Sequence, residues 1–431
     1  MSRSSRNNRR KKNIKLNYQR LSILVILILI VIMGSMLGAK ALFENIKGSN
    51  VSKNQEALES TSLVDKAPNE LILSATGDVM AHKPQLNAQY DASTDSYSFD
   101  NNYVHIKKYI ESSDLAIANL ETTLAGKDKG YDSYPTFNTP DSIAKALKNA
   151  GFDLLSTINN HSLDKGDLGV NRTLEVLKEL KLDTIGTYTN DSSDNYIIKD
   201  INDIKLGITA FSYGEIKNDT KYLNGIQASN ETKNRLSVFD MTNVENAFNT
   251  IMSAVNNIKN TDMQIVIIHW GNEYQRTPSE FQTTLAQKLC NAGVDIIIGS
   301  HPHVVQPVEM ITSSDNSNET LVIYSLGNFI SNQRREYSGS SFTEDGLLVN
   351  INITKNPKDK EATIKEVSCI PTWVNKYTSP KSTYEIIPLA DKNDLKNIDN
   401  VSIETLKNSF NNTTSLIKTS DIIKYPDKVF E

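Results

Sequence analysis

Cysteine and histidine are scarce in this 431-residue chain, which has two cysteines (Cys290 and Cys369) and six histidines. Two distant cysteines exclude a small disulfide-rich scaffold, and the apolar helical pattern around Cys290 favours two buried thiols. The rarity of histidine makes the position of each one informative. Apolar residues form 38% of the chain and occur in blocks suited to a core, which excludes a disordered protein.

Acidic residues are absent from residues 1–40, and charge of either sign is absent from residues 21–39. The eight Lys and Arg of residues 1–20 predict a basic cytoplasmic tail. Residues 21–39 would form a helix of about 28 Å, close to the ~30 Å membrane core, so we expect a transmembrane anchor. A cleavable signal peptide is the competing interpretation, since Ala39-Lys40-Ala41 fits a small-x-small cleavage pattern. An anchor predicts a single-pass cell-membrane protein with its main domain outside the cell.

The remainder of the chain is acidic. Once the eight basic residues of the tail are set aside, 38 basic residues stand against 51 acidic ones, a net charge of −13. Such a field repels other polyanions, so we expect no nucleic-acid partner. An anionic substrate would need a local positive charge, such as a bound metal ion.

Strand and helix patterns alternate from about residue 70 onwards. Apolar runs that read as strands include 71–75, 115–119, 153–158, 205–211, 264–269, 294–299 and 321–325, and helical patterns cover 141–150, 170–180, 244–258 and 278–292. The alternation predicts an α/β layered domain over residues 70–375, in which 345–370 forms two strands. Residues 40–69 predict a stalk, and 376–431 a polar C-terminal extension.

Each polar cluster of the sequence directly follows an apolar strand. The clusters are Gly77-Asp78, Asn119-Leu120-Glu121, Asn159-Asn160-His161, His269-Trp270-Gly271 and Gly299-Ser300-His301-Pro302-His303. Open α/β sheets collect function at the carboxyl ends of their strands, so we expect one shared site. Carboxylate and imidazole ligands suit Mn²⁺, Fe²⁺ or Zn²⁺, and there are more of them than one ion needs. We therefore predict two divalent metal ions.

The clusters resemble the ordered motifs of a known superfamily, the calcineurin-like metallophosphoesterases. The strings GDVMAH, NLET, NNHSLDKG, HWGNEY, GSHPHVVQPVE and YSLGNFI more closely resemble its CapA, or PgsA, branch, over residues 71–332. The resemblance implies a layered metallophosphoesterase-like sandwich and a role in the production of capsule or poly-γ-glutamate.

The resemblance also implies a two-metal site with a bridging carboxylate. By position it assigns Asp78 and His303 to one ion, Asn160, His269 and His301 to the other, and Glu121 to the bridge. The superfamily has Asp where Glu121 stands. It also has one residue between the Asp and His of its first motif, whereas three residues separate Asp78 from His82. His82 is therefore a candidate ligand whose role stays open.

Two further residues receive roles in catalysis. His161 would protonate the leaving oxygen or stabilise phosphate charge. Asp164 would orient His161, and a helix or turn cap at Asp164 or Asp167 is the equal alternative.

Three functions are open at this stage. The first is a membrane-anchored CapA-type protein in capsule or poly-γ-glutamate synthesis or export, partnered by the cytoplasmic membrane, a membrane-bound polymer synthase and an anionic polymer. The second is a general metal-dependent phosphoesterase with a phosphate-ester substrate. The third is a non-catalytic assembly factor of a synthase complex.

Overall fold

The computed structural model describes residues 67–189, 194–358, 360–396, 398 and 400–431. The folded unit considered below runs from Pro68 to Glu431. The predicted tail (1–20), the predicted membrane span (21–39) and the predicted stalk up to residue 66 lie outside the described residues.

Among the described residues, no helix has the length and apolar character needed to cross a membrane. The longest one, α7 (Val244–Ile258), has 15 residues, whereas a membrane span needs about 20. This finding contradicts the predicted location at the cell membrane with an outside domain, and that prediction is corrected accordingly.

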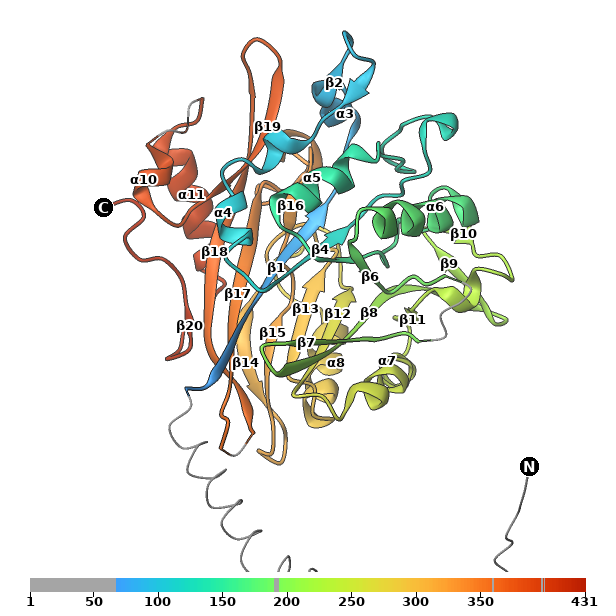
Figure 1. The fold of residues 1–431 in the computed structure, drawn as a ribbon, viewed down its shortest axis with the longest axis vertical. Coiled ribbons are helices and arrows are strands. Elements are labelled where there is room, and N and C mark those ends of the chain that lie inside the picture. Colours follow the sequence, from blue (N-terminus) through green and yellow to red (C-terminus); the bar gives the residue numbers. More distant parts are fainter. Residues whose placement is uncertain (1–66, 190–193, 359, 397, 399) are drawn as a thin grey trace, which may run out of the picture. The chain divides into compact units, whose positions relative to one another are not determined.

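The described residues form two nine-stranded sheets (Figure 1). The first has the order β19 (Ser382–Pro388), β18 (Ala362–Thr378), β17 (Asp345–Lys355), β1 (Asn69–Val79), β4 (Leu115–Leu120), β5 (Leu154–Ser156), β6 (Asp183–Ile185), with β16 (Asn328–Ile330) beside β1 and β20 (Ile423–Lys424) beside β18. The second has the order β10 (Ile226–Gln227), β9 (Thr220–Leu223), β8 (Ile204–Lys217), β12 (Met263–His269), β13 (Ile296–Ser300), β15 (Glu319–Ile323), β14 (Val308–Thr312), with β7 (Ile197–Ile201) and β11 (Val238–Asp240) beside β8. A small hairpin joins β2 (Tyr90–Asp91) to β3 (Ser96–Tyr97).

Helices pack against both sheets, and those of the second core and the third core lie on outer faces. Those of the first half are α3 (Lys83–Gln89), α4 (Lys107–Ile110), α5 (Ser142–Ala150) and α6 (Gly166–Glu179). Those that follow are α7, α8 (Glu280–Asn291), α9 (Arg335–Ser338), α10 (Lys392–Leu395) and α11 (Ile403–Thr414). In Figure 1, α7 and α8 lie beside β12 and β13 of the second sheet.

Of the four apolar cores of the described residues, three lie between layers, and the fourth packs α10 and α11 against β18 and β19. Leu73 of β1 and Ile267 of β12 belong to one core, so this core fills the space between the two sheets. Leu147 of α5 packs with Ala118 of β4 in a second core, on the outer face of the first sheet. A third joins α7 and α8 to the outer face of the second sheet. The predicted α/β sheet fold is confirmed, and both cysteines are buried free thiols, as predicted.

An aspartate stands immediately before each of four parallel strands and holds the neighbouring strand at its start. The backbone N–H groups of Ile72, Ala116, Lys205 and Gln264 donate to the carboxylates of Asp114, Asp153, Asp262 and Asp295 respectively, at 2.6–3.0 Å. The backbone N–H of each aspartate donates in return to the carbonyl of the same residue. These paired bonds fix the register of β1–β4, β4–β5, β8–β12 and β12–β13 at the edge opposite the strand carboxyl ends.

Candidate metal centre

The predicted ligand residues come together at the carboxyl ends of the parallel strands. Asp78 is the penultimate residue of β1, and Glu121, Asn160, His269 and the His301/His303 pair end or follow β4, β5, β12 and β13. All are buried, with exposed fractions of 0–4%. Gly77 lets the end of β1 lie close to the backbone of Gly327, because a Cβ at position 77 would lie 1.8 Å from the carbonyl oxygen of Gly327. The backbone N–H of Asp78 donates to that same oxygen at 3.0 Å.

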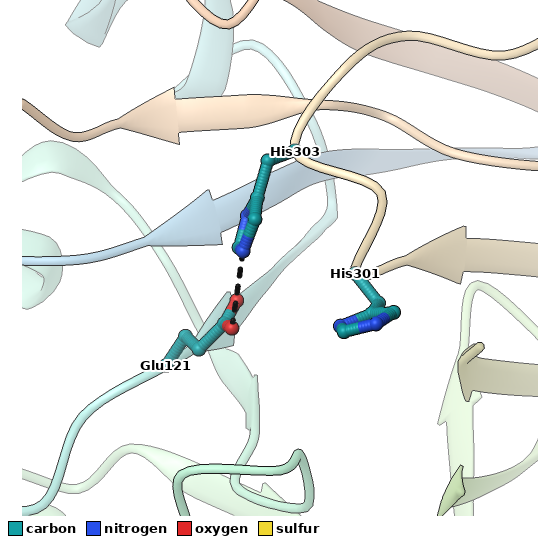
Figure 2. Close-up of side chains that lie close together, drawn as sticks. All are labelled: Glu121, His301 and His303. Atoms are coloured by element: carbon teal, nitrogen blue, oxygen red, sulfur yellow. Dashed lines mark ion pairs between the residues drawn. The ribbon is translucent and has the colours of Figure 1, made fainter. Parts of the chain in front are cut away.

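Two groups of side chains could each hold a metal ion, and both contain Glu121. One consists of Glu121, His301 and His303, and the other of Asp78, Glu121 and His269. Within each group the ligand atoms lie within 4.8 Å of one another. Figure 2 shows His303 pointing toward the carboxylate of Glu121, with His301 on the same loop. Glu121 is therefore common to both candidate groups.

Two buried atoms at the centre have no hydrogen-bond partner, Oε1 of Glu121 and Nδ1 of His301. Leaving such an atom unpaired costs about 1–3 kcal/mol. Oε1 of Glu121 lies 3.7 Å from Nε2 of His269 and 3.8 Å from Nε2 of His303. Each of these two distances is too long for a hydrogen bond. Each fits a metal ion placed between the two atoms of the pair, with a bond of about 2 Å to either atom. The residues present therefore fit a divalent metal.

The electrostatics of the centre also suit a cation. Burial, reinforced by the neighbouring histidines, holds the pKa values of His269 and His301 well below their usual range, so both rings are neutral. Burial and the nearby Asp78 carboxylate raise the pKa of Glu121 well above its usual value. Neutral imidazoles are ready to bind a metal, and a cation would relieve the crowding of the two carboxylates.

The chain was compared with known proteins. The family model described as bacterial capsule synthesis protein PGA_cap matches residues 72–333. The chain belongs to this family. It is 30% identical to the capsule biosynthesis protein CapA of Bacillus anthracis over 305 residues, covering 69% of this chain and 68% of that one. It is 28% identical to the PGA biosynthesis protein CapA of Bacillus subtilis over 297 residues, covering 68% and 70%.

Solved structures offer more remote likenesses to this PGA_cap protein. A phosphatase from Mycoplasma pneumoniae aligns with a TM-score of 0.41 and 16% identity, over 71% of this chain and 94% of that one. A calcineurin-like phosphoesterase from Bacillus subtilis aligns with a TM-score of 0.39 and 18% identity, over 81% and 98%. These likenesses are too remote to bear on the chemistry of the site.

Around the ligands of the PGA_cap centre, polar side chains orient each ring. Ser300 Oγ lies 2.8 Å from Nδ1 of His269, whose Nε2 lies 2.9 Å from Oδ1 of Asn160. Nδ1 of His303 lies 3.2 Å from the carboxylate of Asp78, which leaves Nε2 directed at Glu121. The two candidate groups place His303 with His301 and Asp78 with His269, whereas the family resemblance assigned Asp78 and His303 to one ion.

Three residues that surround the candidate ligands were given no role in the site by the sequence analysis. Asn119 donates to Asp78 at 2.8 Å, and Oδ1 of Asn328 lies 3.2 Å from Nδ1 of His303. The ring of Tyr213 lies parallel to that of His269, with centroids 6.2 Å apart. Asn119 and Asn328 lie in two motifs quoted from the sequence, Asn119-Leu120-Glu121 and YSLGNFI, and these motifs were the available signal. Tyr213, inside the long strand β8, carried none.

His161 and Asp164 form a buried pair beside the metal centre. Oδ2 of Asp164 accepts a hydrogen bond from the backbone N–H of Phe137 at 2.6 Å and lies 2.8 Å from Nδ1 of His161. Because a carboxylate only accepts, Nδ1 of His161 carries the hydrogen, and Nε2 remains for proton exchange. The ring of Phe137 meets His161 edge-on at 4.8 Å and restricts its movement.

His82 belongs to neither ligand group. It stands at the N-cap of α3, its Nδ1 accepts from the backbone N–H of Asn332 at 3.3 Å, and its ring packs edge-on against Phe137. Burial, followed by the charge of His303, lowers its pKa to about 4. His82 nevertheless lines the same pocket as His161 and His303, which has a volume of about 320 Å³.

Three non-glycine residues at the centre have left-handed backbone conformations. The φ angles are +101° for His301, +59° for His303 and +65° for Tyr274. The backbone N–H of Tyr274 donates to the carbonyl of Pro302 at 2.8 Å, which ties the loop after β12 to the loop after β13. Strained residues persist where their surroundings determine them fully, so this region is built for a specific geometry.

Proposed function

We propose that this protein serves the synthesis of a capsule polymer of the poly-γ-glutamate type, and that its site is a two-metal hydrolytic centre acting on that polymer. The capsule role rests on family membership and on the two capsule-related relatives. The observation that carries the hydrolytic part is the unpartnered Oε1 of Glu121, common to both ligand groups. Two-metal centres act on amides as well as on phosphate esters, so the amide bonds of such a polymer are compatible with this site.

The chain's own residues supply the remaining parts of a hydrolytic reaction. When bound, the metal ions would polarise the scissile group and lower the pKa of a coordinated water. His161, with Nδ1 held by Asp164, keeps Nε2 available to pass a proton to the leaving group. Burial of the candidate ligands limits competing water around the reacting atoms, and the adjoining pocket of about 320 Å³ offers space for a substrate.

Metal content per chain is the first test. The full chain, the Asp78→Ala/His301→Ala double variant and the control Glu280→Gln would be loaded with Mn²⁺ or Zn²⁺, dialysed and analysed by elemental analysis. We expect about two equivalents in the wild type and the control, and loss of metal in the double variant. Circular dichroism would show that the double variant is folded.

Activity is then measured on γ-linked glutamate oligomers and on an aryl phosphodiester. Cleavage of the oligomers supports the proposal. Cleavage of the phosphodiester alone would favour a general phosphoesterase instead. Absence of bound metal in the folded wild type would overturn the hydrolytic assignment and leave a non-catalytic assembly factor as the better account.

A further inference from the structure

The pocket beside the candidate metal centre is lined by residues that are unusual for a protein that binds an anionic polymer. Among its described lining residues, Glu273 is the single Asp or Glu, and none is Lys or Arg. Glu273 is exposed, and no Lys or Arg of the described chain forms an ion pair with it. Away from the metals, the fixed charge of the pocket is therefore negative.

Three tyrosines share this pocket with Glu273. Tyr134 and Tyr337 are 74% and 73% exposed, which is exceptional for large aromatic side chains, and they come from separate segments of the chain. Tyr274 follows Glu273 directly and is held in its left-handed conformation against the loop of His301 and His303. The ring centroid of Tyr274 lies 6.2 Å from that of His303, so this wall adjoins the metal centre.

A carboxylate among aromatic rings is the composition with which proteins recognise organic cations. The faces of aromatic rings carry negative potential and attract ammonium groups, and a carboxylate adds a charge-assisted hydrogen bond. The same carboxylate repels the carboxylate of a substrate that approaches it. The lining residues therefore favour the binding of an ammonium group and disfavour the binding of internal, carboxylate-bearing residues of a polyanion.

We propose that Glu273, with Tyr134, Tyr274 and Tyr337, forms a binding site for a primary ammonium group of the substrate, next to the metal centre. This inference rests on the proposed function. In a γ-linked glutamate chain, every internal nitrogen belongs to an amide, and a free ammonium exists at the amino terminus alone. The site therefore recognises the end of the polymer, and the protein acts on chain termini.

Equilibrium binding separates the two proposals. Titration calorimetry on the full chain with Mn²⁺ would compare di-γ-glutamate bearing a free amino terminus, its N-acetyl form and butylammonium. We expect the wild type to bind the free-amine dipeptide about 10–100-fold more tightly than the acetylated one. In Glu273→Gln that ratio should fall to near one, whereas the matched control Glu280→Gln, which alters an exposed carboxylate on α8, should keep it.

Each outcome decides between the alternatives. Equal binding of both dipeptides by the wild type, without binding of butylammonium, overturns the ammonium site and leaves the proposed function standing. Binding of butylammonium that is lost in Glu273→Gln, without binding of either dipeptide, supports the ammonium site and counts against γ-linked glutamate as the substrate. Failure of all three probes overturns both.

Discussion

The substitution Glu121→Gln should change the stability of this protein in opposite directions with and without metal. Without metal, the Glu121 carboxylate is fully buried, close to Asp78, and one of its oxygens has no partner. Burial and Asp78 raise its pKa above the ordinary value of 4.5. A group whose pKa is raised in the folded state stabilises the fold less as pH increases, so the metal-free wild type should lose stability as pH rises above about 4.5.

The size of the effect follows from the same argument. Each unit by which folding raises the pKa of Glu121 costs about 1.4 kcal/mol of stability at high pH. Glutamine has the same shape and no charge, so we expect the metal-free variant to be about 1–3 kcal/mol more stable than the wild type at pH 8. At low pH the two should converge.

Metal should reverse this order. At a free metal concentration 100 times the dissociation constant, binding stabilises the wild type by about 2.7 kcal/mol. A neutral amide is a poor bridging ligand, so the variant should gain much less. Urea unfolding at pH 5 and pH 8, with EDTA or with Mn²⁺, measures all the required differences, with Glu280→Gln as the control. If the variant is less stable than the wild type at pH 8 in EDTA, the electrostatic argument for this centre is refuted.

Three further expectations follow. His161→Ala should lower turnover about 10²–10⁴-fold while metal content stays unchanged, because the histidine exchanges protons and is not needed to hold metal. The urea midpoint should fall, because Asp164 loses its buried partner. Gly77→Ala should destabilise the fold by about 3 kcal/mol, seen as a lower urea midpoint, because its methyl group would collide with the carbonyl of Gly327. Burial raises the pKa of Asp295 to about 6, so Asp295→Asn should be up to about 2 kcal/mol more stable than the wild type at pH 8, with no advantage at pH 4, in the same urea assay.

Apolar runs and the residues that follow them were sufficient to predict the sheets and the meeting point of the ligands. The run before His269 is observed as β12, and residues 345–370 hold two strands, β17 and the first half of β18. Strand identity depends on local pattern, and parallel strands share one functional edge, so both could be anticipated.

The first residue of a helix was harder to predict from the sequence. A start at residue 278 was predicted, but α8 begins at Glu280, and Ser279 is its N-cap. The side chain of Ser279 accepts from the backbone N–H of Gln282, and Oε1 of Gln282 accepts from the backbone N–H of Ser279. This reciprocal pairing fixes where the helix begins, and periodicity does not record it.

The loops that surround the ligands could not be derived from local pattern. Glu273 and Tyr337 are 64 positions apart and meet at one pocket because β12 and α9 bring them there. Likewise, Asn328 reaches His303 because β16 pairs with β1. Such contacts depend on tertiary arrangement, which periodicity does not record.

The four aspartates at the strand starts have a consequence for chemistry at the other end of the sheets. A slip of one residue between parallel strands moves a side chain by about 3.3 Å along the strand and turns it to the opposite face. Metal–ligand distances tolerate errors of only about 0.2 Å. The candidate ligands on β1, β4, β5, β12 and β13 can therefore converge only if each pair keeps its observed register, which in β1–β4 includes one shift between Ala75 and Asp78. Asp114, Asp153, Asp262 and Asp295 thus help to position a candidate metal site that none of them touches.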